Sequence, residues 1–309
     1  TMMKEKINTI LENCHSSWGN DEKTTNLEER IHKWIDPVET EDEKLLLLEL
    51  MNNFNYYPRN LIPNIFRDLN ENFYKNATEP DYTLYLPMFS KNGKYNHSFE
   101  MIKNFQIGTQ LASDYFITNP TEAQNSSSYP LNQIKNIVII DDFIGTGNTF
   151  KKFIRHLNSN YPKLVKGKNL YLIVVEICDF GLEKIKQYLK KESINVTIIP
   201  HKIHKKAFHE NHIFDGKHAT SAREIIKQRE TAIGSSYILG YEESEALLAF
   251  YYNTPNNTLS IFWHENHRRN WNPLFPRNKF KKPIWQKKTG NFNYNMRKKI
   301  NSKKGNNNG

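Results

Sequence analysis

Two kinds of hydrophobic spacing alternate along residues 81–264 and predict an α/β fold. Short runs of consecutive apolar residues, many of them β-branched, are typical of strands buried on both faces of a parallel sheet. Such runs predict strands over residues 83–88, 137–141, 170–177, 196–199 and 259–263. Between these runs, apolar residues recur every three or four positions and predict helices over residues 99–116, 151–158 and 182–190. The alternation favours a parallel sheet with helices packed against it.

The first 80 residues show helical spacing instead. Apolar residues lie on one face of helices predicted over residues 28–35 and 41–54, and a third helix begins at Asn60. This helical region could cap the sheet or dock a partner, and the sequence does not choose between the two. We therefore predict three parts: a helical region over residues 1–80, an α/β domain over residues 81–286, and a basic, disordered tail over residues 287–309.

Residues 137–149 hold the most informative motif of the chain. An apolar strand, Ile137 to Ile140, leads into Asp141 and Asp142, and a Gly-Thr-Gly-Asn-Thr turn then precedes the next predicted helix. Two glycines in the turn can adopt backbone angles that a Cβ forbids, so that successive N–H groups converge on one anion. The helix N-terminus adds partial positive charge. The residues of this predicted phosphate site are Gly145, Thr146, Gly147, Asn148 and Thr149.

Side chains of the turn can contribute as well. The hydroxyls of Thr146 and Thr149 can donate to a phosphate, and Asn148 or Thr149 can cap the first turn of the helix.

Asp141 and Asp142 lie at the carboxyl end of the predicted strand, where ligands bind in open α/β sheets. Two carboxylates beside a phosphate site repel the anion itself, so we expect them to face hydrogen-bond donors or positive charge. The 2- and 3-hydroxyls of a ribose meet this need, as does Mg²⁺ bound directly or through water. As catalytic residues, the two acids would stabilise positive charge that develops on the sugar.

Two other classes of nucleotide-binding protein are excluded. A P-loop ATPase requires an upstream G-x-x-x-x-G-K-[ST] loop, which the sequence does not contain. A dinucleotide-binding turn requires a third glycine, but Phe150 follows Thr149 here. An ordinary strand, turn and helix without a ligand is the remaining alternative.

At residues 137–149 the chain resembles the type I phosphoribosyltransferases, which bind 5-phosphoribosyl-1-pyrophosphate. The resemblance implies that the turn binds the 5-phosphate and that Asp141 and Asp142 contact the ribose hydroxyls. In purine-salvage members, an aspartate proposed as a base stands at the position of Gly145, so this chain is not a simple relative of those enzymes.

The family also has a pyrophosphate-binding loop after the first strand of the domain. In this chain, that place holds two lysines and a glycine just before a predicted helix, and both features suit a pyrophosphate. The resemblance assigns the role to Lys91, Asn92, Gly93 and Lys94. A mobile loop that closes over the substrate would correspond to residues 119–129, but no Lys or Arg occurs there before Lys135.

A wider resemblance covers most of the chain. Gly240-Tyr241-Glu242, residues 253–259, Phe262-Trp263 and residues 271–275 follow the turn in the order found in phosphoribosyltransferase-like proteins of bacterial anti-phage defence systems, including retrons. This resemblance implies an effector that transfers ribose phosphate to an acceptor that the sequence does not identify. The alternative is a non-catalytic subunit that senses a nucleotide or binds nucleic acid.

Charge is concentrated at the C-terminal end. Residues 266–309 contain thirteen Lys or Arg and no acid, which leaves residues 1–265 at a formal charge of about −3. Aromatic residues are interleaved with these charges, a pattern that suits nucleic acid or an acidic protein partner.

The remaining composition favours a cytoplasmic protein without a membrane partner. Cys14 and Cys178 are the only cysteines, and no apolar run approaches the length of a membrane span. Four histidines between residues 201 and 212 lack the cysteines or paired carboxylates of a zinc site and have lysines among them, which favours a basic rim near the ligand.

Overall fold

The structure, a computed structural model, describes residues 2–89, 97–281 and 283. Residues 1–276 form one compact unit, and residues 277–309 form a second unit. The tail predicted over residues 287–309 lies outside the described residues. Among the residues that are described, no helix is both long and apolar enough to cross a lipid bilayer.

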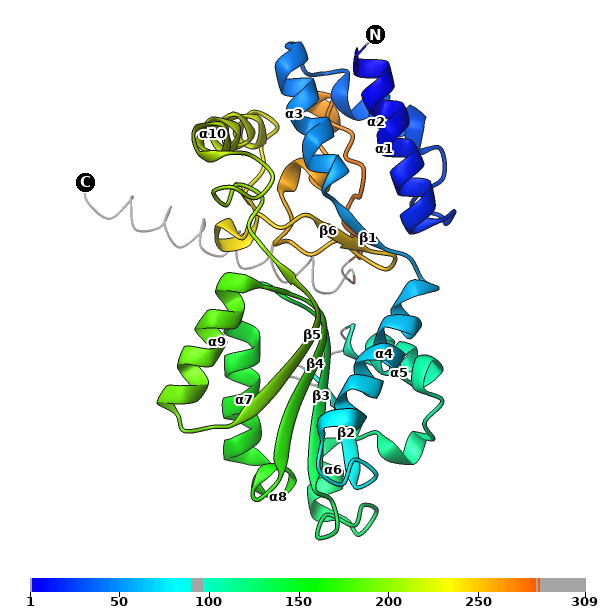
Figure 1. The fold of residues 1–309 in the computed structure, drawn as a ribbon, viewed down its shortest axis with the longest axis vertical. Coiled ribbons are helices and arrows are strands. Elements are labelled where there is room, and N and C mark those ends of the chain that lie inside the picture. The colour runs from blue at the N-terminus through cyan, green and yellow to red at the C-terminus, as the bar shows by residue number, and fades with distance from the viewer. Residues whose placement is uncertain (1, 90–96, 282, 284–309) are drawn as a thin grey trace, which may run out of the picture. The chain divides into compact units, whose positions relative to one another are not determined.

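Four parallel strands form the central sheet, in the order β2 (Thr83–Pro87), β3 (Asn136–Ile144), β4 (Asn169–Cys178) and β5 (Val196–His204) (Figure 1). In the register of the sheet, Ile140 on β3 pairs with Pro87 on β2 and with Ile173 on β4. The predicted α/β class with a parallel sheet is therefore confirmed. The first four predicted strands correspond to these four, although β3 continues through the two acids to Ile144 and β5 continues past Ile199 to His204.

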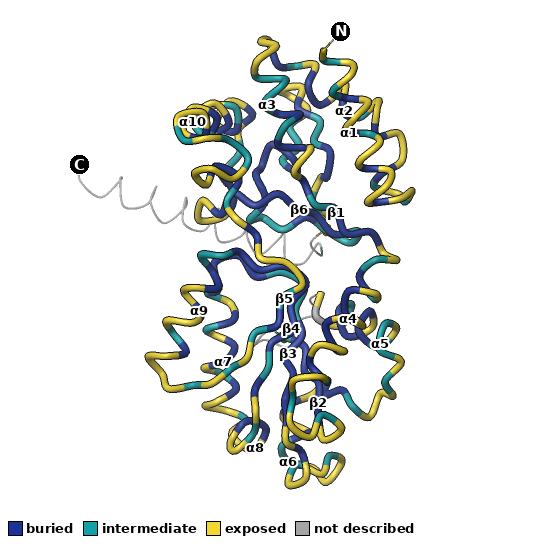
Figure 2. Tube along the Cα trace, viewed as in Figure 1, coloured by how far each residue is buried: buried dark blue, intermediate teal, exposed yellow. Residues whose placement is uncertain are grey.

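Helices cover both faces of this sheet, which explains the long apolar runs in β3 and β4. α7 (Asn148–Asn160) and α9 (Asp179–Lys191) pack on the face that carries Ile137 and Ile139. α4 (Leu61–Asn76) and α5 (Ser98–Thr109) pack on the opposite face, against Val138 and Ile140. β2, β3 and β4 are consequently buried along most of their length, whereas the edge strand β5 is buried only at Ile199 and His204 (Figure 2). Two short helices, α6 (Pro120–Asn125) and α8 (Pro162–Val165), complete this half.

A second hydrophobic core lies beyond the carboxyl ends of the strands (Figure 1). It joins α1 (Met2–Trp18), α2 (Leu27–Ile35), α3 (Glu41–Asn52) and α10 (Gly216–Ala232) to residues 259–275. The N-terminal helices thus share their core with the C-terminal part of the same unit. We refer to α1, α2, α3 and α10 together with residues 239–275 as the cap. Its link to the sheet is a parallel pair of short strands, β1 (Asn55–Tyr57) and β6 (Leu248–Phe250).

A buried hydrogen-bond network fixes the strand pair to the sheet. The Tyr57 hydroxyl donates to Glu176 on β4, and Nδ1 of His204 lies 2.6 Å from the other carboxylate oxygen of Glu176. The Leu247 N–H donates to Nε2 of His204 at 3.1 Å. His204 is therefore a buried structural residue rather than part of an exposed basic rim.

The prediction of a strand over residues 259–263 is wrong. This segment forms the 3₁₀ helix η3 (Ser260–Phe262), and its residues are completely buried. The Ile261 carbonyl accepts from the indole N–H groups of Trp34 and Trp271, while the Ile261 N–H donates to Glu230. Because side chains satisfy this backbone, the apolar run needs no neighbouring strand.

Two helices also differ from expectation. The helix predicted over residues 99–116 ends at Thr109, where Gln110 adopts a left-handed conformation with φ of 60°. Within residues 119–129, where a mobile loop was expected, the structure has α6. Asn119 caps this helix by accepting from the Glu122 N–H, and Ala123 is buried. The cap and the buried apolar side chain together stabilise the helix.

Candidate functional site

The predicted phosphate turn lies between β3 and α7, at the carboxyl edge of the sheet. Gly147 has φ of 79°, a left-handed conformation that favours glycine, and α7 begins at the next residue. Neither Asn148 nor Thr149 caps the helix, contrary to the prediction: Gly147 occupies the N-cap position. The Thr146 hydroxyl instead accepts from the Asn148 N–H at 3.3 Å.

Close backbone packing fixes the turn on two sides. A Cβ on Gly145 would lie 2.3 Å from Nδ2 of Asn257, and a Cβ on Gly181 would lie 1.9 Å from the Gly145 carbonyl oxygen. A side chain at position 145 would therefore collide with Asn257. At position 147 a side chain would also be crowded, and the left-handed backbone angle favours glycine in addition. The turn is held between the first turn of α9 and a segment of the cap.

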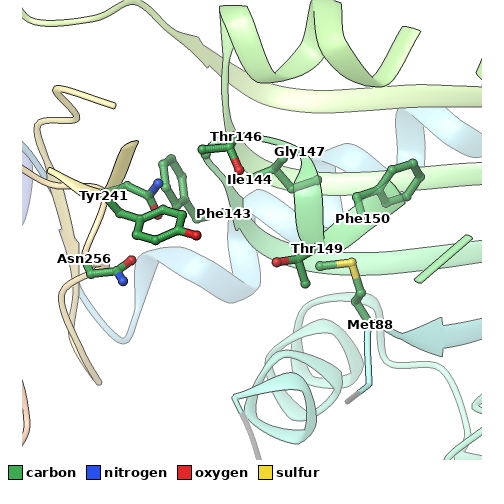
Figure 3. A pocket seen from close by; sticks show the side chains of 11 residues that line it. Met88, Phe143, Ile144, Thr146, Gly147, Thr149, Phe150, Tyr241 and Asn256 are labelled. Carbon is green, nitrogen blue, oxygen red and sulfur yellow. The ribbon is translucent and has the colours of Figure 1, made fainter. Parts of the chain in front are cut away.

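A pocket of about 390 Å³ opens over this turn. Figure 3 shows the Tyr241 ring and the Asn256 carboxamide across from the hydroxyls of Thr146 and Thr149. The walls thus combine the predicted phosphate turn with residues that follow it by about a hundred positions. The full lining is Met88, Phe143, Ile144, Gly145, Thr146, Gly147, Thr149, Phe150, Tyr241, Asn256 and Asn257.

The two acids differ in their hydrogen bonds. Both oxygens of Asp142 are engaged: Oδ1 accepts from the Phe143 N–H at 2.6 Å, and Oδ2 accepts from the Tyr252 hydroxyl. Oδ1 of Asp141 accepts from the Asp142 N–H at 3.0 Å. Oδ2 of Asp141 is buried and has no hydrogen-bond partner in the described part of the chain. An acceptor of this kind is costly to bury, so it marks a place where a ligand can contribute a donor or a cation.

Burial and a neighbouring charge determine the pKa of Asp141. Loss of solvent raises the pKa of Asp141 well above its usual value, and the neighbouring charge of Asp142 raises it further. Burial, followed by the charge of Asp142, likewise raises the pKa of Tyr252, which keeps that hydroxyl protonated as a donor. Asp141 therefore retains a proton more readily than an exposed aspartate until positive charge approaches it.

A carboxylate from the cap lies at the first residue of α7. Glu242 has φ of 50°, and its two oxygens lie 3.3 and 3.4 Å from Nδ2 of Asn148. Arg223 holds the same turn of chain, with contacts of 2.8 Å to Glu243 and 2.6 Å to the buried Glu245. Non-glycine residues with positive φ are strained, and such strain is frequent at functional sites.

The other predicted site residues are not tested by the geometry. Lys91, Asn92, Gly93 and Lys94 lie outside the described residues. His97, which follows them, has its ring 4.8 Å from the ring of Tyr252. Over the described residues, no group of three or more His, Cys, Asp or Glu side chains is arranged to hold a metal ion.

The sequence predicted Asp141, Asp142 and residues 145–149 as one motif, and the structure places them together at the edge of the sheet. It did not predict site positions for Asn256, Asn257 or Tyr252. The only signal was that Asn256 and Asn257 belong to residues 253–259, which the wider resemblance includes, whereas Tyr252 lies just before that stretch.

One comparison with known proteins identifies the family of the chain. A family model described as PRTase-CE matches residues 31–277. Among solved structures, the AQ2163 protein from Aquifex aeolicus is similar over 66% of this chain and 84% of its own, with a TM-score of 0.31 and 14% identity. No curated protein matches the chain. Because the family model covers most of its length, the chain belongs to the PRTase-CE family and is phosphoribosyltransferase-like.

Proposed function

We propose that the protein binds 5-phosphoribosyl-1-pyrophosphate together with Mg²⁺ and transfers ribose phosphate to an acceptor. The observation that carries the proposal is the buried Oδ2 of Asp141, which has no hydrogen-bond partner among the described residues and lies on the strand that leads into a glycine-rich turn at a helix N-terminus. A phosphorylated sugar has both groups that such a site requires, an anion for the turn and hydroxyl donors for the acid.

In this proposal, the turn from Gly145 to Thr149 binds the 5-phosphate through its amides and hydroxyls. Asp141 and Asp142 accept from the ribose hydroxyls. Substitution at the anomeric carbon builds positive charge on the sugar, and two half-buried carboxylates near the ring would stabilise that charge. The pyrophosphate-binding role of Lys91, Asn92, Gly93 and Lys94 remains part of the proposal.

The residues present are suitable for Mg²⁺. Asp141 offers a free buried carboxylate oxygen, and a hard divalent cation prefers oxygen ligands. Two protein carboxylates with substrate oxygens and water form the usual environment of Mg²⁺, which rarely has a cage made only of protein atoms. When bound, the ion would neutralise the departing pyrophosphate. Asp141 and Asp142 would hold it directly or through water.

We further propose that the transfer serves an anti-phage defence system, with a nucleic acid or protein partner that binds the basic C-terminal residues. This role is supported by the wider sequence resemblance and by the excess of Lys and Arg after residue 265.

A non-catalytic sensor is the second candidate. It is favoured by Asn257, whose carboxamide fills the space beside Gly145. A carboxamide cannot accept a proton from an incoming nucleophile, so Asn257 does not provide a general base beside Gly145. A protein of this kind would bind the same ligand without consuming it.

Isothermal calorimetry with 5-phosphoribosyl-1-pyrophosphate, with and without Mg²⁺, tests ligand binding. We expect Mg²⁺-dependent binding that Asp141→Asn weakens at least tenfold. Absence of binding by the unmodified chain would refute the proposal. Release of pyrophosphate together with a ribosylated product would separate the transferase from the sensor.

A further inference from the structure

Tyr252 creates a difference between the two acids of the site. Its hydroxyl donates to Oδ2 of Asp142, whose Oδ1 already accepts from the Phe143 N–H. Within the described residues, Asp141 has no such partner for its own Oδ2. One acid is thus held by the protein, while its neighbour has a free buried oxygen.

The Tyr252 ring is itself firmly packed. It stacks on Phe250 with ring centroids 5.4 Å apart, and it contacts the rings of His97 and Tyr251 at 4.8 and 5.1 Å. Phe250 and Asn253 close a tight backbone turn around it, with the Phe250 N–H donating to the Asn253 carbonyl at 2.9 Å. A side chain packed in this way holds its hydrogen-bond partner in one orientation.

The adjacent tyrosine anchors this turn to the sheet domain. The Tyr251 hydroxyl donates to Glu100 and accepts from Nδ2 of Asn104 at 2.9 Å, and both partners belong to α5. The guanidinium of Arg59 lies over the Tyr251 ring, 4.5 Å from its centroid. The position of the Tyr252 hydroxyl is therefore set jointly by the cap and by α5.

We propose that Tyr252 is a positioning residue that fixes Asp142 and thereby leaves Asp141 as the principal acceptor for the ribose hydroxyls of the ligand. The inference rests on the proposed function, because it assigns roles within the same site. Tyr252 acts through Asp142 and makes no contact with the ligand. An unheld Asp142 would rotate and compete with Asp141 for the same donors, which would lower the affinity for the sugar.

A double-mutant cycle on ligand affinity tests this coupling. The dissociation constant for 5-phosphoribosyl-1-pyrophosphate with Mg²⁺ is measured for the unmodified chain, Tyr252→Phe, Asp142→Asn and the double variant. We expect Tyr252→Phe to weaken binding about tenfold in the unmodified chain and less than twofold in the Asp142→Asn background. We also expect Asp141→Asn to weaken binding more than Asp142→Asn.

Tyr56→Phe is the matched control, since Tyr56, which belongs to the cap core, makes the same type of hydroxyl–carboxylate contact, to Asp21. It should leave the affinity unchanged. An unchanged affinity for Tyr252→Phe, or an equal loss in both backgrounds, overturns the positioning role while the proposed function stands. If the unmodified chain does not bind the ligand, the proposed function and the role of Tyr252 both fall.

Discussion

The backbone of Gly145 lies against the carboxamide of Asn257, so closely that a Cβ on residue 145 would come within 2.3 Å of Nδ2. Asn257 is fixed in this place because Nδ2 donates to the Ser244 hydroxyl at 2.8 Å. The contact joins the phosphate turn to the cap across 112 positions of sequence, and both residues line the same pocket. The cap thus determines which residue type the turn can have.

Replacing Gly145 with alanine should disturb both the fold and the ligand site. The new methyl group would force Asn257 away and would press the turn toward α9, where Gly181 already contacts the Gly145 carbonyl. We expect a loss of about 1–3 kcal/mol in the free energy of unfolding, as for other overpacked positions, and weaker binding of the sugar phosphate. Urea denaturation and calorimetry would measure the two effects.

Gly216→Ala is the control for that substitution. The only atom near a Cβ at this position is a carboxylate oxygen of Glu210, at 3.7 Å, so the change should be neutral or slightly stabilising. A Gly145→Ala variant as stable as Gly216→Ala would contradict the close packing of the turn against Asn257.

Ligand binding should release a proton from Asp141. Burial and the charge of Asp142 raise its pKa, so the free protein holds this proton more tightly than an exposed aspartate would. A bound cation or hydroxyl donor favours the ionised form, and the proton then leaves. Calorimetric titrations in buffers of different ionisation enthalpy should therefore give different observed enthalpies. The difference should shrink in Asp141→Asn, and an equal difference in that variant would exclude Asp141 as the source.

Glu230 should make the stability of the cap depend on pH. Burial raises its pKa to about 7 from an ordinary value of 4.5, although backbone N–H groups of Leu239 and Ile261 donate to it. Between these two values the folded chain binds a proton that the unfolded chain has lost. The stabilisation is complete below pH 4.5 and is lost as the pH rises through about 7, by about 3 kcal/mol in total.

Denaturant unfolding between pH 5 and 8 measures this effect. Glu230→Gln should be less stable at pH 5, because one backbone donor loses its acceptor, and its stability should vary less with pH. Glu224→Gln changes an exposed position of the same helix and should retain the full dependence. A dependence of equal size in Glu230→Gln would assign the effect to another group.

The charge of Glu242 should oppose binding of a phosphate. Its carboxylate lies beside Asn148 at the start of α7, where the helix N-terminus favours anions. Glu242→Gln keeps the shape of the side chain and removes this repulsion, so we expect the dissociation constant for the sugar phosphate to fall a few-fold at low salt. The gain should diminish at high salt because Glu242 is exposed. Glu71→Gln, an exposed change on α4, should have no effect.

Removal of the residues after Pro276 should abolish nucleic-acid binding without changing the stability of the fold. A chain that ends at Pro276 keeps Trp271, Leu274 and Phe275 in the cap core and should unfold like the intact chain. It should lose salt-sensitive binding to RNA or DNA, since it lacks eleven of the thirteen Lys and Arg residues of the C-terminal region 266–309. A chain that ends at Glu265 should unfold, because those core residues are missing. Undiminished nucleic-acid binding after truncation at Pro276 would place the interaction elsewhere.

The local sequence determined the central strand of the sheet and the turn that follows it. The run from Ile137 to Ile140 specifies a buried strand, because β-branched apolar residues occupy both faces of a sheet covered by helices. The acids and the glycine-rich turn follow within nine residues, so their proximity in space needs no knowledge of the rest of the chain. The class of fold and the position of the candidate site were therefore predictable.

Only the tertiary structure decided which distant residues contact the acids and the turn. Tyr252 reaches Asp142 and Asn257 reaches Gly145 from more than 100 positions away, and no periodicity in the sequence encodes contacts over that separation. Residues 259–263 show the same limit, since their apolar run suits a strand, but the cap core offers side-chain partners to its backbone and the segment becomes a 3₁₀ helix. Local chemistry placed the acids, whereas long-range packing determined which of them has a free oxygen.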